Sequence, residues 1–95
     1  MKLVWLRKAN ANRIAAIARI AEEDPGAARD QLDEITRQTI RLMEYPELGR
    51  PGRQPDTREL SIVRTPFLIV YRIRPKAQRI EILRFLHSRQ QWPEK

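Results

Sequence analysis

"FLIVY", residues 67–71, is apolar at every position. Successive side chains of a strand point to opposite faces of a sheet, so a strand without polar positions is covered on both faces. The β-branched and aromatic residues of this stretch favour a strand over a helix. We therefore predict that a strand over 67–74 lies at the centre of a sheet.

Two further strands are predicted beside it, over 58–64 and 79–87. In the first of them, apolar Leu60 and Ile62 alternate with polar residues, which is typical of a strand with one covered face. Short proline-containing segments separate the three strands, and such segments form turns. Because short connections join antiparallel neighbours, we expect an antiparallel meander.

The N-terminal half has a helical pattern. "KLVWL" (2–6) predicts a short strand, and apolar residues at helical spacing predict helices over 8–23 and 25–45. The short break between them makes an antiparallel hairpin, and the proline-rich and glycine-rich segment 45–57 is an irregular connection. The predicted fold is α+β, with the N-terminal strand and the helical hairpin packed on the C-terminal meander. A single hairpin covers one face of a sheet, so part of the other face is left open or is filled by another chain.

Length and composition limit the classes of function. A chain of 95 residues forms one domain with one core, here spanning 1–95. The absence of cysteine excludes disulfides and thiolate metal sites, and a single histidine excludes a histidine metal cluster. No apolar run is longer than five residues, which is far short of a membrane span or a signal peptide. We expect a cytoplasmic protein that needs no cofactor and no metal.

Charge is unevenly distributed along the chain. The 19 basic and 12 acidic residues give a net charge of +7. Residues 1–48 are neutral overall, with eight basic and eight acidic groups, whereas residues 58–89 carry eight basic groups and only Glu59 and Glu81. The basic groups of the second segment are mostly arginines, whose planar guanidinium suits bidentate contacts with phosphates and carboxylates. A polyanion or an acidic protein is the expected partner of such a surface.

Four groups of residues, in this order and at this spacing, resemble the RelE/ParE family of bacterial toxins. They are Gly49-Arg50-Pro51, Arg58-Glu59-Leu60, Tyr71-Arg72 and "IEILRFLHSRQQWP" (80–93). The match spans nearly the whole chain and is closer to the ParE branch than to the RelE branch. The resemblance implies a type II toxin that is neutralised by a ParD-like or similar antitoxin. ParE members of the family typically poison DNA gyrase, whereas RelE members cut mRNA on the ribosome.

The sequence departs from the nuclease branch at several positions. RNA cleavage needs a proton acceptor, cations for the phosphate and a proton donor. RelE-type nucleases tend to place lysines in the connecting loop and an arginine in the central strand, but residues 49–57 contain no lysine and the central position is Leu68. Trp92 stands where such nucleases often keep a tyrosine. The resemblance therefore favours a gyrase poison, and mRNA cleavage remains the alternative.

No catalytic residue is assigned from the sequence. For a nuclease, the candidate set would be His87, Arg89 and Arg72. For binding of the target or the antitoxin, the candidates are the arginines of the C-terminal strands and the tryptophan of the tail. These are Arg58, Arg64, Arg72, Arg84, Arg89 and Trp92.

Several side chains keep two interpretations. His87 could cap the end of a strand or act as a base. Arg84, on the same face as Ile80 and Ile82 by period-two counting, could extend over apolar surface on the uncovered face or pair with a glutamate. Trp92 could cover the end of the core or anchor a partner. A third function, that of a non-toxic binding module, also stays open.

Overall fold

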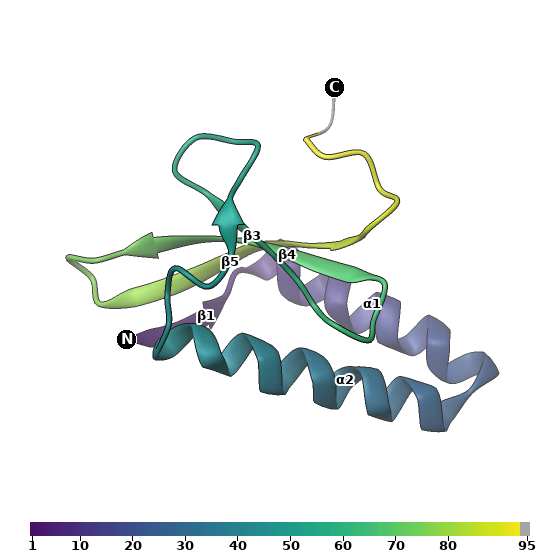
Figure 1. Ribbon diagram of the computed structural model, residues 1–95. Helices are drawn as coiled ribbons and strands as arrows, with labels where there is room; N and C mark the ends of the chain where they lie inside the picture. The colour runs from purple at the N-terminus through teal and green to yellow at the C-terminus, as the bar shows by residue number, and fades with distance from the viewer. Residues whose placement is uncertain (94–95) are drawn as a thin grey trace.

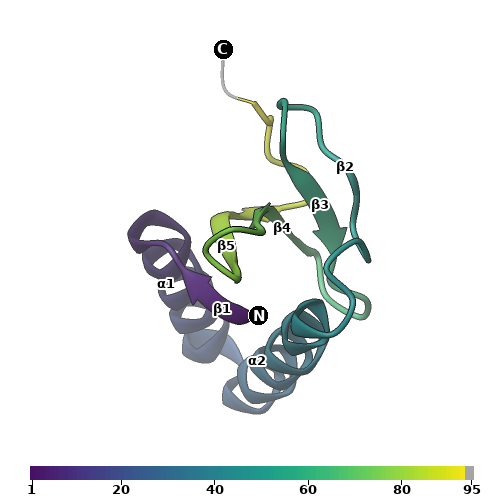
Figure 2. The same ribbon diagram turned by 90° about the vertical axis from the view of Figure 1, so that its left-hand side faces the viewer.

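The computed structural model describes residues 1–93 as one five-stranded sheet with a helical hairpin on one face (Figure 1). The elements are β1 (Lys2–Trp5), α1 (Arg7–Glu23), α2 (Pro25–Ile40), the 3₁₀ turn η1 (Arg41–Met43), β2 (Arg50–Pro51), β3 (Arg58–Ser61), β4 (Phe67–Arg74) and β5 (Arg79–His87). The strand order is β1-β5-β4-β3-β2. Figure 2 shows the loop between β2 and β3 and the C-terminal tail on the side of the sheet opposite the helices. Within the described residues, none of the helices is long and apolar enough to cross a membrane.

The structure confirms the α+β class and the central position of β4. Strands β3, β4 and β5 form the antiparallel meander that the short turns predict. The N-terminal strand β1 adds to the edge of β5 in parallel, because the helical hairpin returns the chain across the same face. The sheet is therefore mixed, with a short strand at each edge.

Three predicted boundaries are wrong. The strand expected over 58–64 ends at Ser61, because the chain turns at Arg64, whose φ is 68°, and the Ile62 N–H bonds the Phe67 carbonyl. The helix expected to reach residue 45 ends at Ile40 and tightens into η1, in which the Glu44 N–H bonds the Arg41 carbonyl at 3.1 Å. The irregular segment 45–57 contains the two-residue strand β2.

The main core lies between the sheet and the hairpin. Helix α2 begins as the sequence predicts, because Asp24 caps it by accepting a hydrogen bond from the Ala27 N–H at 3.0 Å. Ile35 of this helix is fully buried against the sheet. On the strands, the ring of Phe85 packs between those of Phe67 and Trp5, with centroids 4.8 and 6.1 Å away. These contacts fix the hairpin on one face of the meander and leave the other face available.

A β-bulge in β5 changes which face Arg84 occupies. Val70 pairs with Arg84, but its neighbour Tyr71 pairs with Ile82, so Leu83 has no partner in β4. The extra residue reverses the alternation along β5. Period-two counting therefore placed Arg84 wrongly: Ile82 faces the helices, and Arg84 faces the opposite side.

The connection between η1 and β2 is held by a buried tyrosine. The Tyr71 hydroxyl donates to the Pro46 carbonyl at 2.7 Å and accepts from the Gly49 N–H at 2.9 Å. Burial raises the pKa of Tyr71, so the hydroxyl keeps the proton that it donates. A Cβ at position 49 would lie 2.8 Å from both the Glu59 carbonyl oxygen and Tyr71 Oη. Glycine is required at position 49 by this close approach.

Gly49→Ala is expected to lower the free energy of unfolding by about 1–3 kcal/mol, because the backbone oxygen that the new methyl meets cannot move away independently. Gly26→Ala is the matched control. A Cβ there meets only Asp24 Oδ1 at 3.4 Å, and alanine is the better helix former by about 1 kcal/mol. Urea unfolding of both variants checks the prediction. Equal midpoints for Gly49→Ala and the wild type would show that the loop adjusts without cost.

Candidate functional site

Six arginines cover the face of the sheet that the helices leave open. We call this surface the arginine face and define it by Arg50, Arg53, Arg72, Arg74, Arg79 and Arg84. The two acidic residues of the strands, Glu59 and Glu81, also lie on this side, but each is only 3% exposed. Solvent on this face of the strands therefore meets guanidinium groups and almost no carboxylate.

Glu59 is the centre of the first arginine cluster. Its carboxylate accepts hydrogen bonds from the Arg53 guanidinium at 2.8 Å and from the Arg53 backbone N–H at 2.9 Å. Arg50, its cross-strand partner in β2, adds a bond at 3.1 Å. The Arg53 bonds, followed by those of Arg50, lower the pKa of Glu59 to about 2 despite its burial. The carboxylate stays ionised and fixes both arginines.

Glu81 is the centre of the second cluster. Arg72 Nε donates to its Oε1 at 2.6 Å, and Arg79 Nε donates to its Oε2 at 2.7 Å. The hydrogen bond from Arg72 is the largest cause of the lowered pKa of Glu81. Both oxygens are occupied, so the two guanidinium groups are held side by side with their remaining N–H groups free to face solvent.

The C-terminal tail returns over the apolar part of this face. Trp92 packs on Leu68, Val70 and Leu86, which form a second small core. Arg53 Nη1 donates to the Trp92 carbonyl at 2.9 Å, and the Arg84 guanidinium lies 5.5 Å from the centre of the indole ring. Arg84 therefore extends over apolar surface on the uncovered face, which was one of its two interpretations.

His87 lies on the other side of the sheet from Arg72. It pairs with Phe67 and contacts that ring edge-on at 6.0 Å, so it faces the helical layer. Its Nδ1 accepts the Arg89 backbone N–H at 3.1 Å, which stabilises the turn after β5. Arg72 follows Phe67 by five residues in β4, and its side chain lies on the arginine face. The set of His87, Arg89 and Arg72 is not brought together.

Comparison with known proteins gives the family. The sequence model described as "ParE toxin of type II toxin-antitoxin system, parDE" matches residues 3–92. The chain belongs to the ParE toxin family. A relative from Sinorhizobium fredii named "Putative toxin Y4kP" is 43% identical over 77 residues, which are 81% of this chain and 77% of that protein.

Solved structures share the fold of this ParE toxin. A chain of the chromosomal ParDE toxin–antitoxin system from P. aeruginosa superposes with a TM-score of 0.80 at 30% identity, covering 92% of this chain and 95% of that one. The isolated E. coli RelE toxin gives a TM-score of 0.63 at 13% identity, with 96% and 87% covered. The intact E. coli RelBE complex gives 0.64 at 12%, with 94% and 98% covered. The two RelE comparisons show a common fold.

The remaining predicted binding residues of the ParE toxin make contacts outside the two glutamate-centred clusters. Arg58 donates to the Gly49 carbonyl at 2.7 Å and so stabilises the loop before β2. Arg64 forms a two-bond ion pair with Glu34 of α2, at 2.8 and 2.9 Å. Arg89 follows β5 in the exposed tail. Of the six predicted residues, Arg72, Arg84 and Trp92 share the open face of the sheet, and Arg58 lines a hollow together with Arg72.

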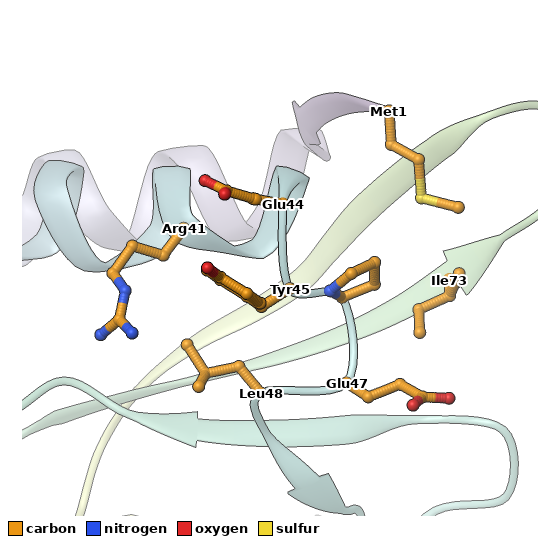
Figure 3. Close-up of a pocket in the computed structure, with 8 residues that line it drawn as sticks. Met1, Arg41, Glu44, Tyr45, Glu47, Leu48 and Ile73 are labelled. Carbon is orange, nitrogen blue, oxygen red and sulfur yellow. The ribbon is translucent and has the colours of Figure 1, made fainter.

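One hollow of the toxin lies at the end of the helical hairpin. A pocket of about 630 Å³ lies where η1 meets β4 (Figure 3). Tyr45 lies within the pocket. The charged side chains that line the pocket point in different directions; they are Arg41, Glu44 and Glu47. Within residues 1–93, no three histidine, cysteine or acidic side chains lie close enough together to hold a metal ion.

Sequence reasoning did not predict the two buried glutamates that lie beneath the arginine face. The partners of Glu59 are Arg50 of β2 and Arg53 of the loop that follows it. The signal that could have found this cluster is the isolation of Glu59 and Glu81, the only acidic residues in a strongly basic segment. A buried glutamate is tolerated only where it is paired, and the surrounding arginines could supply such partners.

The Glu59 cluster predicts a pH dependence of the toxin's stability. The pKa of a glutamate in an unfolded chain is about 4.3, and the pKa of Glu59 in the folded protein is about 2. A lowered pKa in the folded state contributes stability that is complete above the unfolded value and is lost as the pH falls through the folded value. The wild type should therefore lose stability between about pH 5 and pH 2.

Glu59→Gln should lower the free energy of unfolding by about 2 kcal/mol at pH 7. Because it lacks the carboxylate, its free energy of unfolding should fall less than that of the wild type between about pH 5 and pH 2. Urea unfolding at each pH measures the difference, and parallel curves would contradict the assignment.

Proposed function

We propose that this ParE toxin inhibits growth by binding DNA gyrase and stabilising the intermediate in which the enzyme has cleaved DNA. The observation that carries the proposal is the arginine face, whose guanidinium groups are held in place by two buried carboxylates. A poison of this kind needs a rigid binding surface and no active site of its own, because gyrase makes the break. Electrostatic complementarity would then speed its association with an enzyme–DNA complex.

The separation of His87 from Arg72 supports the poison over the nuclease. Ribonucleolytic cleavage needs the proton acceptor and the phosphate-binding cation around the same phosphodiester. Here the histidine faces the helical layer, and the arginine pair of Glu81 lies on the opposite face. An mRNA substrate on the arginine face would meet cations without a nearby imidazole.

The antitoxin would neutralise the toxin at the arginine face. As a member of a toxin–antitoxin family, the chain has an antitoxin partner, and we propose that an acidic segment of this ParD-like protein folds across the arginine face. Carboxylates would then occupy the guanidinium N–H groups that gyrase and its DNA would otherwise use. Both partners would be met in the cytoplasm, and loss of the antitoxin after loss of a plasmid would release the toxin.

Two reactions run in parallel test the proposal. The purified toxin is added to gyrase with supercoiled plasmid and ATP, and to translating ribosomes with a defined mRNA. Linear plasmid after detergent and protease treatment, with intact mRNA, is the expected result. Cleaved mRNA with untouched plasmid would replace the proposal with the nuclease. No effect in either reaction, from a protein that also fails to inhibit growth, would favour a non-toxic binding module.

A further inference from the structure

We propose that the arginine face binds the phosphate backbone of duplex DNA directly, and that the buried Glu59 and Glu81 are positioning residues for that contact. The inference rests on the proposed function in taking this DNA to be the segment held by gyrase. It adds a partner that the gyrase proposal alone does not require, since a poison could bind only the enzyme.

The first argument is the orientation of the guanidinium groups. Arg72 and Arg79 each direct Nε to Glu81, yet their side chains remain 38% and 44% exposed. A guanidinium has five N–H donors in one plane, so several donors of each group remain available. Phosphate oxygens accept such paired donors with high geometric specificity. The carboxylate beneath fixes the arginines before the partner arrives, which lowers the entropy lost on binding.

The second argument is the spacing of the two clusters. Glu59 pairs with Val70 and Glu81 pairs with Arg72, so the carboxylates lie two strands apart and two residues apart along the sheet. Strand geometry separates their backbones by about 10 Å across and about 7 Å along the strands, or about 12 Å in all. Each strand of a DNA duplex carries one phosphate for about every 3.4 Å of helix axis. Two clusters at this separation can therefore contact separate phosphates of one duplex.

The third argument is the shortage of apolar anchors on this face. Leu68, Val70 and Leu86 are buried under the half-buried Trp92, which has the guanidinium groups of Arg53 and Arg84 beside it. Protein interfaces concentrate their binding energy in apolar or aromatic side chains that become fully buried at the centre. Interfaces with DNA are more polar and far more basic. The arginine face has the second composition.

Two models of DNA binding, a diffuse positive field and positioned arginines, make opposite predictions when a buried glutamate is replaced with glutamine. Glu81→Gln and Glu59→Gln each raise the net charge from +7 to +8. A diffuse positive field predicts tighter binding to DNA, whereas loss of positioning predicts binding about 10-fold weaker. Glu34→Gln is the matched control, because Glu34 also holds two arginines, Arg37 and Arg64, but on helix α2. Its affinity for DNA should stay equal to that of the wild type or rise slightly.

Binding is measured by fluorescence anisotropy of a labelled 20-base-pair duplex over a series of salt concentrations, after circular dichroism confirms that each variant is folded. Arg72→Gln and Arg79→Gln should each lower the salt slope by about one, and Arg37→Gln should leave it unchanged. These arginine variants decide the test if a glutamate variant does not fold.

Tighter or unchanged binding by folded Glu81→Gln would overturn the inference, as would unchanged slopes for the arginine variants. Binding of poly-glutamate without binding of the duplex would overturn it in favour of an acidic protein segment. Trapped gyrase cleavage without duplex binding would overturn the inference while leaving the proposed function intact. Duplex binding without gyrase trapping would support the inference and contradict the proposed function.

Discussion

Replacing Arg72, Arg79 and Arg84 together with glutamine is expected to reduce the potency of gyrase poisoning by about 100-fold or more. A hydrogen bond to a charged group contributes about 1.5–3 kcal/mol, which is about 10-fold or more in affinity for each residue, and the effects of neighbours are not fully additive. The glutamines can still donate amide N–H groups to the buried Glu81 carboxylate, and circular dichroism checks that the variant is folded before its potency is measured. Potency is the toxin concentration that gives half-maximal linear plasmid with gyrase and ATP.

The control for this variant replaces Arg19, Arg29 and Arg37 of the helices with glutamine. Both triple variants reduce the net charge from +7 to +4, but they remove the charge from different faces of the molecule. If general attraction between a basic protein and DNA caused the poisoning, both should lose potency equally. We expect the helix variant to stay within a few-fold of the wild type. Equal losses would mean that the arginine face has no special role.

The elements that the sequence predicts well are those whose patterns have one physical explanation. "FLIVY" has no polar position, and alternate side chains of a strand bury in this way only where both faces of the sheet are covered. Asp24 and Pro25 form a helix start whose hydrogen bond and backbone angle are local properties. Short turns leave strands β3, β4 and β5 no option other than antiparallel pairing. In each case the deciding interactions lie within about ten residues.

The features that sequence reasoning missed depend on contacts between distant segments. The bulge at Leu83 cannot be seen in an alternating pattern, although it decides that Arg84 lies on the open face. Parallel pairing of β1 with β5 joins residues almost eighty positions apart. Arg64 resembles the other arginines in sequence, but the turn that precedes β4 directs it to Glu34 on a helix. Residue type predicted a basic surface, and topology decides which arginines share one face of the sheet.

Dependence on contacts between distant segments also explains why the sequence does not single out the buried glutamates. A carboxylate in a strand is expected at the surface unless its partners are known, and the partners of Glu59 come from a loop without a predictable path. That path depends on Gly49 and Tyr71, which place β2 beside β3. The core and the candidate site are therefore coupled, since Tyr71 belongs to the core and the loop that it holds supplies Arg50 and Arg53.

Phe85→Ala is expected to lower the free energy of unfolding by about 3–5 kcal/mol, the typical cost of removing a buried aromatic ring. Phe85 is 3% exposed and joins the rings of Phe67 and Trp5. Domains of this size have a total stability of about 5–10 kcal/mol, so the variant should unfold at a much lower urea concentration. Ile14→Ala, at a helix position that is 59% exposed, should change stability by less than about 0.5 kcal/mol.

This core variant separates loss of fold from loss of the binding surface. The arginine face lies on the opposite side of β5 from Phe85, so folded molecules of Phe85→Ala should still present Arg84 and the Glu81 cluster. Gyrase poisoning by this variant should fall only in proportion to the folded fraction, measured by circular dichroism at the assay temperature. The arginine variant should lose potency while fully folded. A Phe85→Ala protein that is folded but inactive would show that activity depends on the helical side of the sheet, and the site would then have to be sought around His87.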